Sequence, residues 1–259
     1  MSTAVVTGAS VGIGAAYADR FARRGFDLLL VARNKNRLDE LAAELTGSTG
    51  RKVEILAADL TDPADLRAVE ERLRTDEDID VLVNNAGGAA FSPLADADPD
   101  ALENLITLNV TSLTRLSAAA ASAFAGRRHG TIVNISSVLA LNLLPTSAVY
   151  SATKSFVLTL SQSLQQELAD QGVRVQVVLP GALRTALWDG SGIELSSLPT
   201  EIVMEVGDAV DAALAGLDNG ETVTILSLPD IADWDAYVAA RDALVPNLSL
   251  PTPAPRYTS

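Results

Sequence analysis

The chain has 259 residues and a mass of 27.0 kDa. Its formal net charge of −14 argues against general affinity for nucleic acid or anionic membranes, because both need Lys and Arg side chains to neutralise phosphate groups. The absence of cysteine excludes disulfides, thiolate metal ligands and cysteine nucleophiles, and we predict no metal site.

Hydrophobic residues make up 48% of the chain and aromatic residues only 4%, so the core must consist mainly of Ala, Val, Leu and Ile. That composition is typical of buried parallel strands covered by helices. We expect a single domain over residues 1–259, a length that one α/β unit commonly reaches. The chain enters a strand without a leader pattern and lacks an apolar run of about 20 residues, so we predict a cytoplasmic protein.

The first predicted unit is a strand over residues 3–7 that a glycine-rich loop joins to a helix over residues 13–24. Gly8, Gly12 and Gly14 allow a tight turn and a close approach of the backbone to a ligand. The helix that follows offers unpaired N–H groups to a phosphate. We interpret this loop as a cradle for a dinucleotide pyrophosphate, and an ordinary glycine-rich turn is the alternative.

The second predicted strand covers residues 26–32 and ends at Arg33, where the adenosine ribose lies in dinucleotide-binding folds. An arginine there can pair with a 2′-phosphate, whereas an acidic residue would repel it. Arg33 therefore favours NADP(H), and Asn34 can add a hydrogen bond. NAD(H) stays possible because Val11 supplies no second cation in the glycine loop.

A helix is predicted from residue 36 to residue 45, followed by a third strand over residues 53–57. Asp62 and Pro63 are typical of the N-cap and first position of the next helix. Asp59 comes at the carboxyl end of the strand. It could accept a hydrogen bond from an adenine amine or stabilise the turn, and the sequence leaves both open.

The fourth predicted strand covers residues 80–83 and ends in Asn84-Asn85-Ala86-Gly87-Gly88. Small residues at a strand end let a flat ligand approach, and the asparagines can brace the turn or face a cofactor. A helix is predicted over residues 102–124. Asn109 falls within it, and a polar amide in such an apolar run needs a partner.

The fifth predicted strand, residues 131–135, leads to Ser137, and a long helix follows over residues 149–169. Ligand chemistry in open α/β sheets gathers at the carboxyl ends of strands, where Ser137 lies. Tyr150 and Lys154 are four residues apart and share one helical face. A phenol with a pKa of about 10 becomes a useful acid when a cation stabilises its phenolate, although exposed pairs at this spacing are common.

A sixth strand is predicted over residues 173–179, closed by Pro180-Gly181. Residues 182–206 break the alternation of strands and helices and carry few charges, which favours an apolar lid over a substrate. A surface excursion without a binding role is the alternative. A helix over residues 207–217 and a strand over residues 222–226 complete the sheet.

The chain ends in a proline-rich segment, residues 246–259, which we expect to be extended and either packed on a neighbouring subunit or mobile. The alternation of strands and helices before it predicts an α/β fold. We expect a single-domain, doubly wound parallel sheet, a Rossmann fold, of about seven strands with helices on both faces.

These stretches together resemble the short-chain dehydrogenase/reductase family from residue 3 to about residue 185. The matching motifs agree in order and spacing: Thr7–Gly14, Asn84-Asn85-Ala86-Gly87, Ser137 thirteen residues before Tyr150, the Tyr150/Lys154 pair, and Pro180-Gly181 with Thr185. The resemblance implies a catalytic tetrad of Asn109, Ser137, Tyr150 and Lys154. It also implies that Tyr150 exchanges a proton with the substrate oxygen while NADP(H) exchanges a hydride with the carbon.

In this resemblance Ser137 binds the substrate oxygen, Lys154 holds the nicotinamide ribose, and Asn109 anchors a water that links Lys154 to solvent. The implied cofactor contacts are Gly8, Ser10, Gly12, Ile13, Gly14, Arg33, Asn34, Asp59, Leu60, Asn85, Ala86, Gly87, Tyr150, Lys154, Pro180, Gly181 and Thr185. The expected substrate contacts are Ser137, Leu139, Tyr150, Leu187 and Trp188.

We predict that the protein is an NADPH-dependent carbonyl reductase that acts on a small-molecule apolar ketone or aldehyde. The reverse reaction is the oxidation of the corresponding alcohol. Two alternatives use the same fold: an epimerase or dehydratase with transient use of the nicotinamide, and a non-catalytic NADP-binding sensor. The resemblance also implies a homotetramer, with a homodimer as the alternative.

Overall fold

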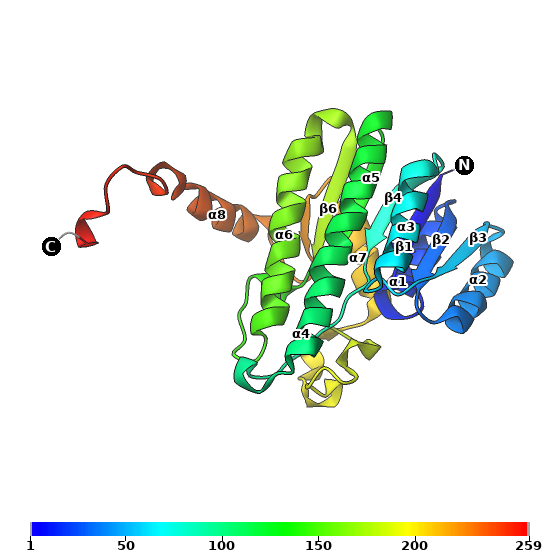
Figure 1. The fold of residues 1–259 in the computed structure, drawn as a ribbon, viewed down its shortest axis with the longest axis horizontal. Coiled ribbons are helices and arrows are strands. Elements are labelled where there is room, and N and C mark those ends of the chain that lie inside the picture. Colours follow the sequence, from blue (N-terminus) through cyan, green and yellow to red (C-terminus); the bar gives the residue numbers. More distant parts are fainter. Residues whose placement is uncertain (1, 258–259) are drawn as a thin grey trace. The chain divides into compact units, whose positions relative to one another are not determined.

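The structure is a computed structural model that describes residues 2–257. Its main feature is a parallel sheet of seven described strands in the order β3-β2-β1-β4-β5-β6-β9 (Figure 1). The strands are β1 (Thr3–Thr7), β2 (Asp27–Ala32), β3 (Val53–Ala57), β4 (Ile79–Asn84), β5 (Gly130–Ile135), β6 (Val173–Leu179) and β9 (Val223–Ile225). The doubly wound parallel sheet that the sequence predicts is confirmed.

The strands are mostly apolar because helices cover both faces of the sheet. Successive side chains of one strand point to opposite faces and enter two separate clusters. In β1, Val5 belongs to one apolar cluster whereas Ala4 and Val6 belong to the other. Every residue of β5 is buried, so the middle of the sheet forms the centre of the core.

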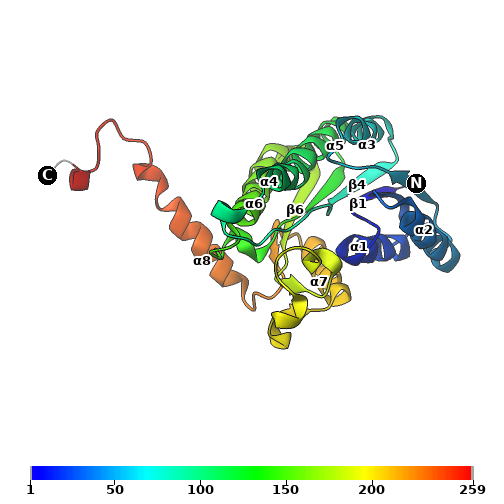
Figure 2. The same ribbon diagram turned by 60° about the horizontal axis from the view of Figure 1, so that its bottom comes forward.

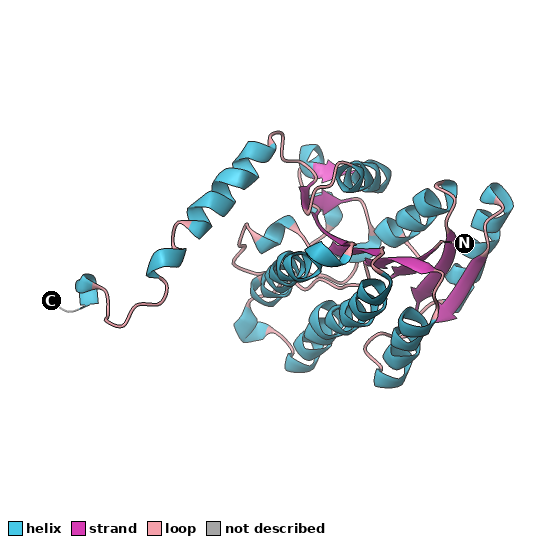
Figure 3. Ribbon diagram, turned by 90° about the horizontal axis from the view of Figure 1, so that it is seen from above, coloured by secondary structure: helices cyan, strands magenta, loops and turns pink. Residues whose placement is uncertain are grey.

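Helices α1, α2 and α7 cover one face of the sheet, and α3 to α6 cover the other (Figures 2 and 3). These helices are α1 (Gly12–Arg23), α2 (Lys35–Thr49), α3 (Pro63–Thr75), α4 (Pro99–Ile106), α5 (Leu113–Arg127), α6 (Ala148–Leu168) and α7 (Val206–Asp218). Asp62 caps α3 as predicted, since its carboxylate accepts hydrogen bonds from the N–H groups of Ala64 and Asp65. Among residues 2–257, none of the helices combines the length and the apolar character that crossing a membrane requires.

The order of the strands reverses between β1 and β4. From β1 the chain proceeds outwards through β2 to β3, and it then returns to place β4 on the other side of β1. In open α/β sheets the crevice outside the carboxyl ends at such a reversal is where ligands bind. The loops after β1 and β4 therefore form the two sides of the expected binding crevice.

The predicted helix over residues 102–124 is wrong as a single element. The structure has α4, then a π-helical segment at Thr107–Ser112, and then α5. The buried hydroxyl of Ser112 donates to the carbonyl of Leu60 (2.6 Å) and also lies 2.9 Å from the carbonyl of Thr107. Because these contacts involve a distant loop, apolar periodicity along the helix could not reveal the break.

The segment over residues 182–206 begins and ends in two short strands that pair with each other. Strands β7 (Ala182–Leu183) and β8 (Val203–Met204) pair in parallel. The N–H of Arg184 donates to the carbonyl of Met204 (3.1 Å), and its guanidinium pairs with Glu205 (2.7 Å). The two ends of this segment are therefore held together, although its sequence has no helical or strand periodicity that predicts the pairing.

Residues 227–259 form a compact unit separate from residues 1–226. Its main element, α8 (Ile231–Asp242), is absent from the sequence prediction; Asp230 caps it by accepting a hydrogen bond from Ala232 N–H (2.9 Å). The tail, predicted to be extended, contains short 3-10 turns at Val245–Asn247 and Pro255–Tyr257. The last two residues of the predicted tail, 258 and 259, lie outside the described residues.

Candidate active site

The glycine-rich loop after β1 leaves open backbone at the crevice. Gly8 and Gly12 have φ angles of +64° and +59°, which favour glycine. A Cβ atom at Gly14 would collide with the carbonyl of Gly8. These glycines therefore form a cradle that side chains would fill, in front of the first turn of α1, and this geometry fits a dinucleotide phosphate. Ser10 and Ile13 lie in the same loop and first turn.

The loop after β4 is tied directly to the end of β1. The hydroxyl of Thr7 accepts hydrogen bonds from the N–H groups of Asn85 (3.0 Å) and Ala86 (3.1 Å). The side-chain amide of Asn85 donates to the carbonyl of Thr7 (2.9 Å). The nitrogen of the Asn85 amide thus braces the turn, one of the two roles that the sequence left open.

Arg33 is exposed at the carboxyl end of β2, where the sequence predicts the 2′-phosphate of a dinucleotide. The Asn34 side chain caps α2 by accepting a hydrogen bond from Arg37 N–H (3.1 Å). Asp59 accepts hydrogen bonds from the N–H (2.9 Å) and hydroxyl (2.7 Å) of Thr61, which lower the pKa of its carboxyl group, and the charge of Arg33 lowers it further. Asp59 thus stabilises its turn. Leu60 follows it and is buried.

The π-helical segment places Asn109 against the loop after β4. Its side-chain oxygen accepts a hydrogen bond from Gly88 N–H (2.9 Å), and its amide donates to the Gly88 carbonyl (3.0 Å) and to the Thr153 hydroxyl (3.1 Å). The predicted need of this amide for partners is met. A Cβ atom at Gly87 would lie 3.2 Å from the Asn109 oxygen and 3.5 Å from the Lys154 ammonium. Asn109 and Lys154 therefore flank the same glycine.

Ser137 and Tyr150 come together as the sequence predicts. Ser137 follows β5, and its oxygen accepts a hydrogen bond from Leu139 N–H (3.1 Å). The same side chain hydrogen-bonds the phenol of Tyr150, which acts to lower the phenol pKa. Burial has the larger, opposite effect and raises the pKa of Tyr150 to about 12. The phenol is therefore protonated at neutral pH, as a proton donor must be.

Lys154 lies buried beside Tyr150, one helical turn along α6. Its ammonium donates to the carbonyl of Ile135 (3.0 Å) and lies 5.7 Å from the centre of the Tyr150 ring. Burial lowers the pKa of Lys154 to about 8. The sequence predicts that this cation makes Tyr150 more acidic, but here the pKa of Tyr150 is raised, because burial of the phenol is the largest effect on it.

The segment after β6 completes the edge of the crevice. The Pro180 carbonyl accepts a hydrogen bond from Val138 N–H (2.9 Å), which holds the segment against the Ser137 turn. Gly181 follows and is half-buried. The methyl group of Thr185 lies 3.5 Å from the position a Cβ atom would take at Gly12. The side chain of Thr185 therefore faces the glycine loop.

An apolar wall surrounds the Tyr150 phenol. Phe91 packs edge-on against Tyr150, with 5.4 Å between ring centres, and stacks on Trp188 at 6.0 Å. Leu139 packs against the same cluster. Leu187, also predicted as a substrate contact, is 39% exposed and is not among the residues of this cluster. Sequence reasoning missed Phe91, because it lies in an irregular loop and only folding brings it to Tyr150.

Buried hydroxyl and amide groups hold the strands and helices around the candidate site together. Ser136 donates to the backbone carbonyl of Lys154 (2.7 Å), which joins β5 to α6. The amide of Asn84 donates to Ser117 and Asn134, each at 3.0 Å. The pairing of Asn84 with Asn134 in the β4–β5 register explains this contact. The Asn84 amide thus ties β4 to β5 and to α5, a role that the sequence analysis, which expected the asparagines to brace the turn or face a cofactor, did not include.

Comparison with known proteins agrees with this geometry. The model of the short chain dehydrogenase family matches residues 2–194. A short-chain dehydrogenase from Sphingobium yanoikuyae in complex with NADPH is 51% identical, with a TM-score of 0.96 and coverage of 99% of this chain and 100% of that one. A bulky-bulky ketone specific alcohol dehydrogenase from Comamonas testosteroni is 43% identical, with a TM-score of 0.92 and coverage of 100% and 99%.

Curated relatives include the human 17-beta-hydroxysteroid dehydrogenase type 3, which is 38% identical over 71% of this chain. The matched region spans 60% of that longer protein.

The fold and the glycine loop at its crevice define a dinucleotide-dependent oxidoreductase. The chain belongs to the short-chain dehydrogenase/reductase family, and it is an enzyme of the alcohol–carbonyl couple. The family, fold and enzyme class predicted from the sequence are thereby confirmed.

Proposed function

We propose that the protein is an NADPH-dependent carbonyl reductase that reduces ketones with apolar substituents to secondary alcohols. The observation that carries the proposal is the convergence of Ser137, Tyr150 and Lys154 at the crevice, under an aromatic wall. The Sphingobium relative, which binds NADPH, and the Comamonas relative, which is specific for bulky ketones, support this cofactor and substrate class.

When bound, NADPH supplies the hydride for the carbonyl carbon. Tyr150 donates a proton to the carbonyl oxygen, and Ser137 holds that oxygen by a hydrogen bond. Lys154 holds the nicotinamide ribose, and its charge favours the phenolate left after donation. The side chain of Asn109 is already bonded to Gly88 and Thr153, so it positions the loop and α6. Any water that Asn109 anchors must use its remaining acceptor capacity.

The decisive experiment follows the absorbance of reduced nicotinamide while purified protein and NADPH are mixed with a panel of ketones. We expect consumption of NADPH by the unmodified protein and loss of this activity in Tyr150→Phe. Binding of NADPH without turnover of any ketone would favour the sensor alternative. Product formed without net consumption of NADPH would favour an epimerase or dehydratase.

Arg33 is the proposed partner of the NADPH 2′-phosphate. It is exposed at the carboxyl end of β2, and in the described part of the chain it has no ion-pair partner. We expect Arg33→Asp to shift the ratio of kcat/KM values from NADPH towards NADH by about tenfold or more, because a carboxylate repels the phosphate and binds a ribose hydroxyl. Arg67→Asp is the control, since Arg67 is exposed on α3, a helix that covers the other face of the sheet. An unchanged ratio in Arg33→Asp would show that Arg33 does not contact the phosphate.

The other proposals concern the surroundings of the site. Residues 182–206 act as the substrate lid, and the assembly is a homotetramer built on α5 and α6, with a homodimer as the alternative. Phe156, which is 39% exposed on α6, supports a contact there. Sedimentation equilibrium of the protein and of Phe156→Asp tests the assembly. The cytoplasmic location remains a prediction.

A further inference from the structure

The hydroxyl group of Thr153 joins the first turns of α6 to the loop after β4. Thr153 is 3% exposed and lies between Tyr150 and Lys154 on α6. Its hydroxyl donates to the backbone carbonyl of Tyr150 (2.7 Å). The same oxygen accepts a hydrogen bond from the side-chain amide of Asn109 (3.1 Å), and that amide also donates to the carbonyl of Gly88 (3.0 Å). A chain of hydrogen bonds therefore runs from the loop after β4 to the backbone of Tyr150.

The direction of each hydrogen bond in this chain is fixed. A carbonyl oxygen can only accept, so the single proton of the Thr153 hydroxyl is used on Tyr150. The hydroxyl can then only accept from Asn109, which requires the amide nitrogen to face α6 and the amide oxygen to face the N–H of Gly88 (2.9 Å). A flipped amide would place acceptor against acceptor at Thr153 and donor against donor at Gly88. Thr153 and Gly88 together therefore hold Asn109 in one orientation.

The two ends of this chain of hydrogen bonds lie beside the groups proposed for the reaction. At one end, Gly87 precedes Gly88, and a Cβ atom at Gly87 would lie 3.5 Å from the Lys154 ammonium. At the other end, Tyr150 carries the phenol that hydrogen-bonds Ser137. Because a misplacement of about 1 Å can lower a reaction rate by about a hundredfold, the contacts that place the Tyr150 backbone matter for catalysis.

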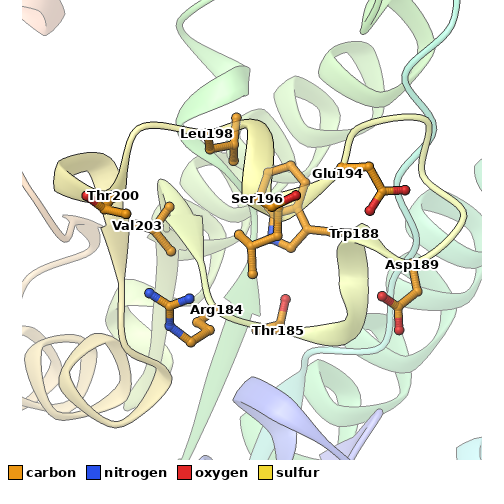
Figure 4. Close-up of a pocket in the computed structure, with 10 residues that line it drawn as sticks. Arg184, Thr185, Trp188, Asp189, Glu194, Ser196, Leu198, Thr200 and Val203 are labelled. Carbon is orange, nitrogen blue, oxygen red and sulfur yellow. The ribbon is translucent and has the colours of Figure 1, made fainter.

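Thr153 itself has almost no surface for contact with a substrate or a cofactor, since its side chain is buried. It also lies outside the open hollow of about 370 Å³ that Thr185, Trp188 and Val203 help to line (Figure 4). Replacing its hydroxyl with a methyl group therefore changes hydrogen bonds without changing the shape of a binding surface. Any effect on the reaction must pass through Tyr150 or Asn109.

Helix α6 contains a second hydroxyl group with the same bonding pattern. Ser161 is buried, donates to the carbonyl of Val157 (2.7 Å) and accepts a hydrogen bond from the side-chain amide of Asn134 (2.9 Å). Asn134 belongs to β5, and its oxygen accepts a hydrogen bond from Asn84. These hydrogen bonds join α6 to the core of the sheet and do not include Tyr150. Ser161 therefore separates the general cost of losing a buried hydroxyl from a specific effect on Tyr150.

We propose that Thr153 is a positioning residue: through Asn109 it couples the Tyr150 backbone to the loop after β4, and it thereby holds the phenol where a substrate oxygen can receive the proton. The inference rests on the proposed reductase function. It assigns to Thr153 an effect on kcat and none on the binding of NADPH, because the two hydrogen bonds between Asn109 and Gly88 do not involve the Thr153 hydroxyl.

Steady-state kinetics of Thr153→Val test this role, since valine keeps the branched shape and removes the hydroxyl. We expect kcat for ketone reduction to fall by about tenfold or more, with the KM for NADPH within about twofold of its original value. Thr153→Ser keeps the hydroxyl and should hold kcat within about threefold of the unmodified protein. An unchanged kcat in Thr153→Val, or an equal loss of kcat in Thr153→Ser, would overturn the inference.

The matched control is Ser161→Ala. It should lower the free energy of unfolding by an amount similar to that of Thr153→Val, because each substitution leaves a buried asparagine amide without one partner. It should nevertheless keep kcat within about twofold of the unmodified protein. Urea unfolding and kinetics of both variants provide the comparison. Equal losses of kcat in the two variants would mean that a general weakening of α6 causes the effect, which contradicts a positioning role.

Hydrogen–deuterium exchange measures the coupling without any turnover. In Thr153→Val, we expect the backbone amides of residues 85–90 and 148–154 to exchange about tenfold faster, because the lost hydrogen bonds join these two segments. Ser161→Ala should leave the exchange of both segments unchanged. Unchanged exchange in Thr153→Val would overturn the coupling. If the unmodified protein reduces no ketone, the proposed function fails and exchange decides the coupling, so the two failures are distinguishable.

Discussion

Lys154 shows how the role proposed for a residue can oppose the stability of the fold. The ammonium is buried, and among residues 2–257 it contacts the Ile135 carbonyl and the ring of Tyr150. Burial lowers the pKa of Lys154 from its ordinary value of 10.5 to about 8. Below pH 8 the protein must hold this charge in a site that favours the neutral amine, and the folded state is less stable for it.

We expect Lys154→Met to raise the unfolding free energy near neutral pH, by about 3 kcal/mol at most, while abolishing reductase activity. The gain should be full below pH 8 and should vanish as pH rises from 8 towards 10.5, because the unfolded lysine then also loses its proton. Urea unfolding of both proteins across this pH range measures the difference in unfolding free energy. A variant less stable than the unmodified protein at neutral pH would show that the Ile135 hydrogen bond outweighs desolvation.

Gly87 is a second residue at which a small substitution is expected to affect the proposed reaction. A Cβ atom there would press on the Asn109 oxygen and the Lys154 ammonium, at 3.2 and 3.5 Å. We expect Gly87→Ala to lower kcat by about tenfold, because small displacements of catalytic groups are costly, and to change the unfolding free energy little.

Gly126→Ala serves as the control for this substitution, since Gly126 lies in α5 with no atom within 4 Å of its Cβ position. It should leave kcat unchanged and stabilise the helix by about 0.5–1 kcal/mol. A normal kcat in Gly87→Ala would mean that Asn109 and Lys154 can shift to accommodate the Cβ atom without loss of activity.

At the scale of the element, the π-helical segment between α4 and α5 positions Asn109. The buried Ser112 hydroxyl holds the segment by its contact with the Leu60 carbonyl. We expect Ser112→Ala to cost about 1–3 kcal/mol of unfolding free energy, because it leaves a buried carbonyl without its partner. Since Leu60 lies at the adenine end of the proposed cofactor site, the KM for NADPH should rise as well.

Ser122→Ala is the control, because Ser122 is exposed on the neighbouring α5. It should change neither the unfolding free energy nor the KM for NADPH. Chemical unfolding and steady-state kinetics of both variants provide the comparison. Equal stability of Ser112→Ala and the unmodified protein would indicate that water replaces the hydroxyl and that the segment does not depend on it.

At the scale of the whole molecule, the net charge of −14 produces repulsion throughout the folded state. Ion pairs such as Arg20–Asp211 and Arg24–Asp218, at 2.8 and 2.9 Å, join α1 to α7 but are exposed, so each contributes little. We expect the unfolding temperature to rise with NaCl, because screening weakens the repulsion more than it weakens these pairs. Differential scanning calorimetry over a salt series tests this, with sucrose as an uncharged control. A fall in the transition temperature would mean that the ion pairs dominate.

Sequence reasoning reached the elements whose signals are local. The strands that form the sheet are short, mostly apolar runs. The residues of the glycine loop, like Tyr150 and Lys154, lie within a few positions of one another. It did not reach α8 or the break in the predicted helix over residues 102–124. The helix break depends on Leu60 and Gly88, which are distant in the sequence.

The amino-acid sequence by itself determined the parallel α/β architecture, the family, and the four side chains proposed for catalysis, because periodicity and short motifs are properties of neighbouring residues. Only the tertiary structure decided that Phe91 and Trp188 surround the phenol, and that burial raises the pKa of Tyr150 and lowers that of Lys154. The physical reason is that desolvation and side-chain packing depend on what folding brings together from separate parts of the chain.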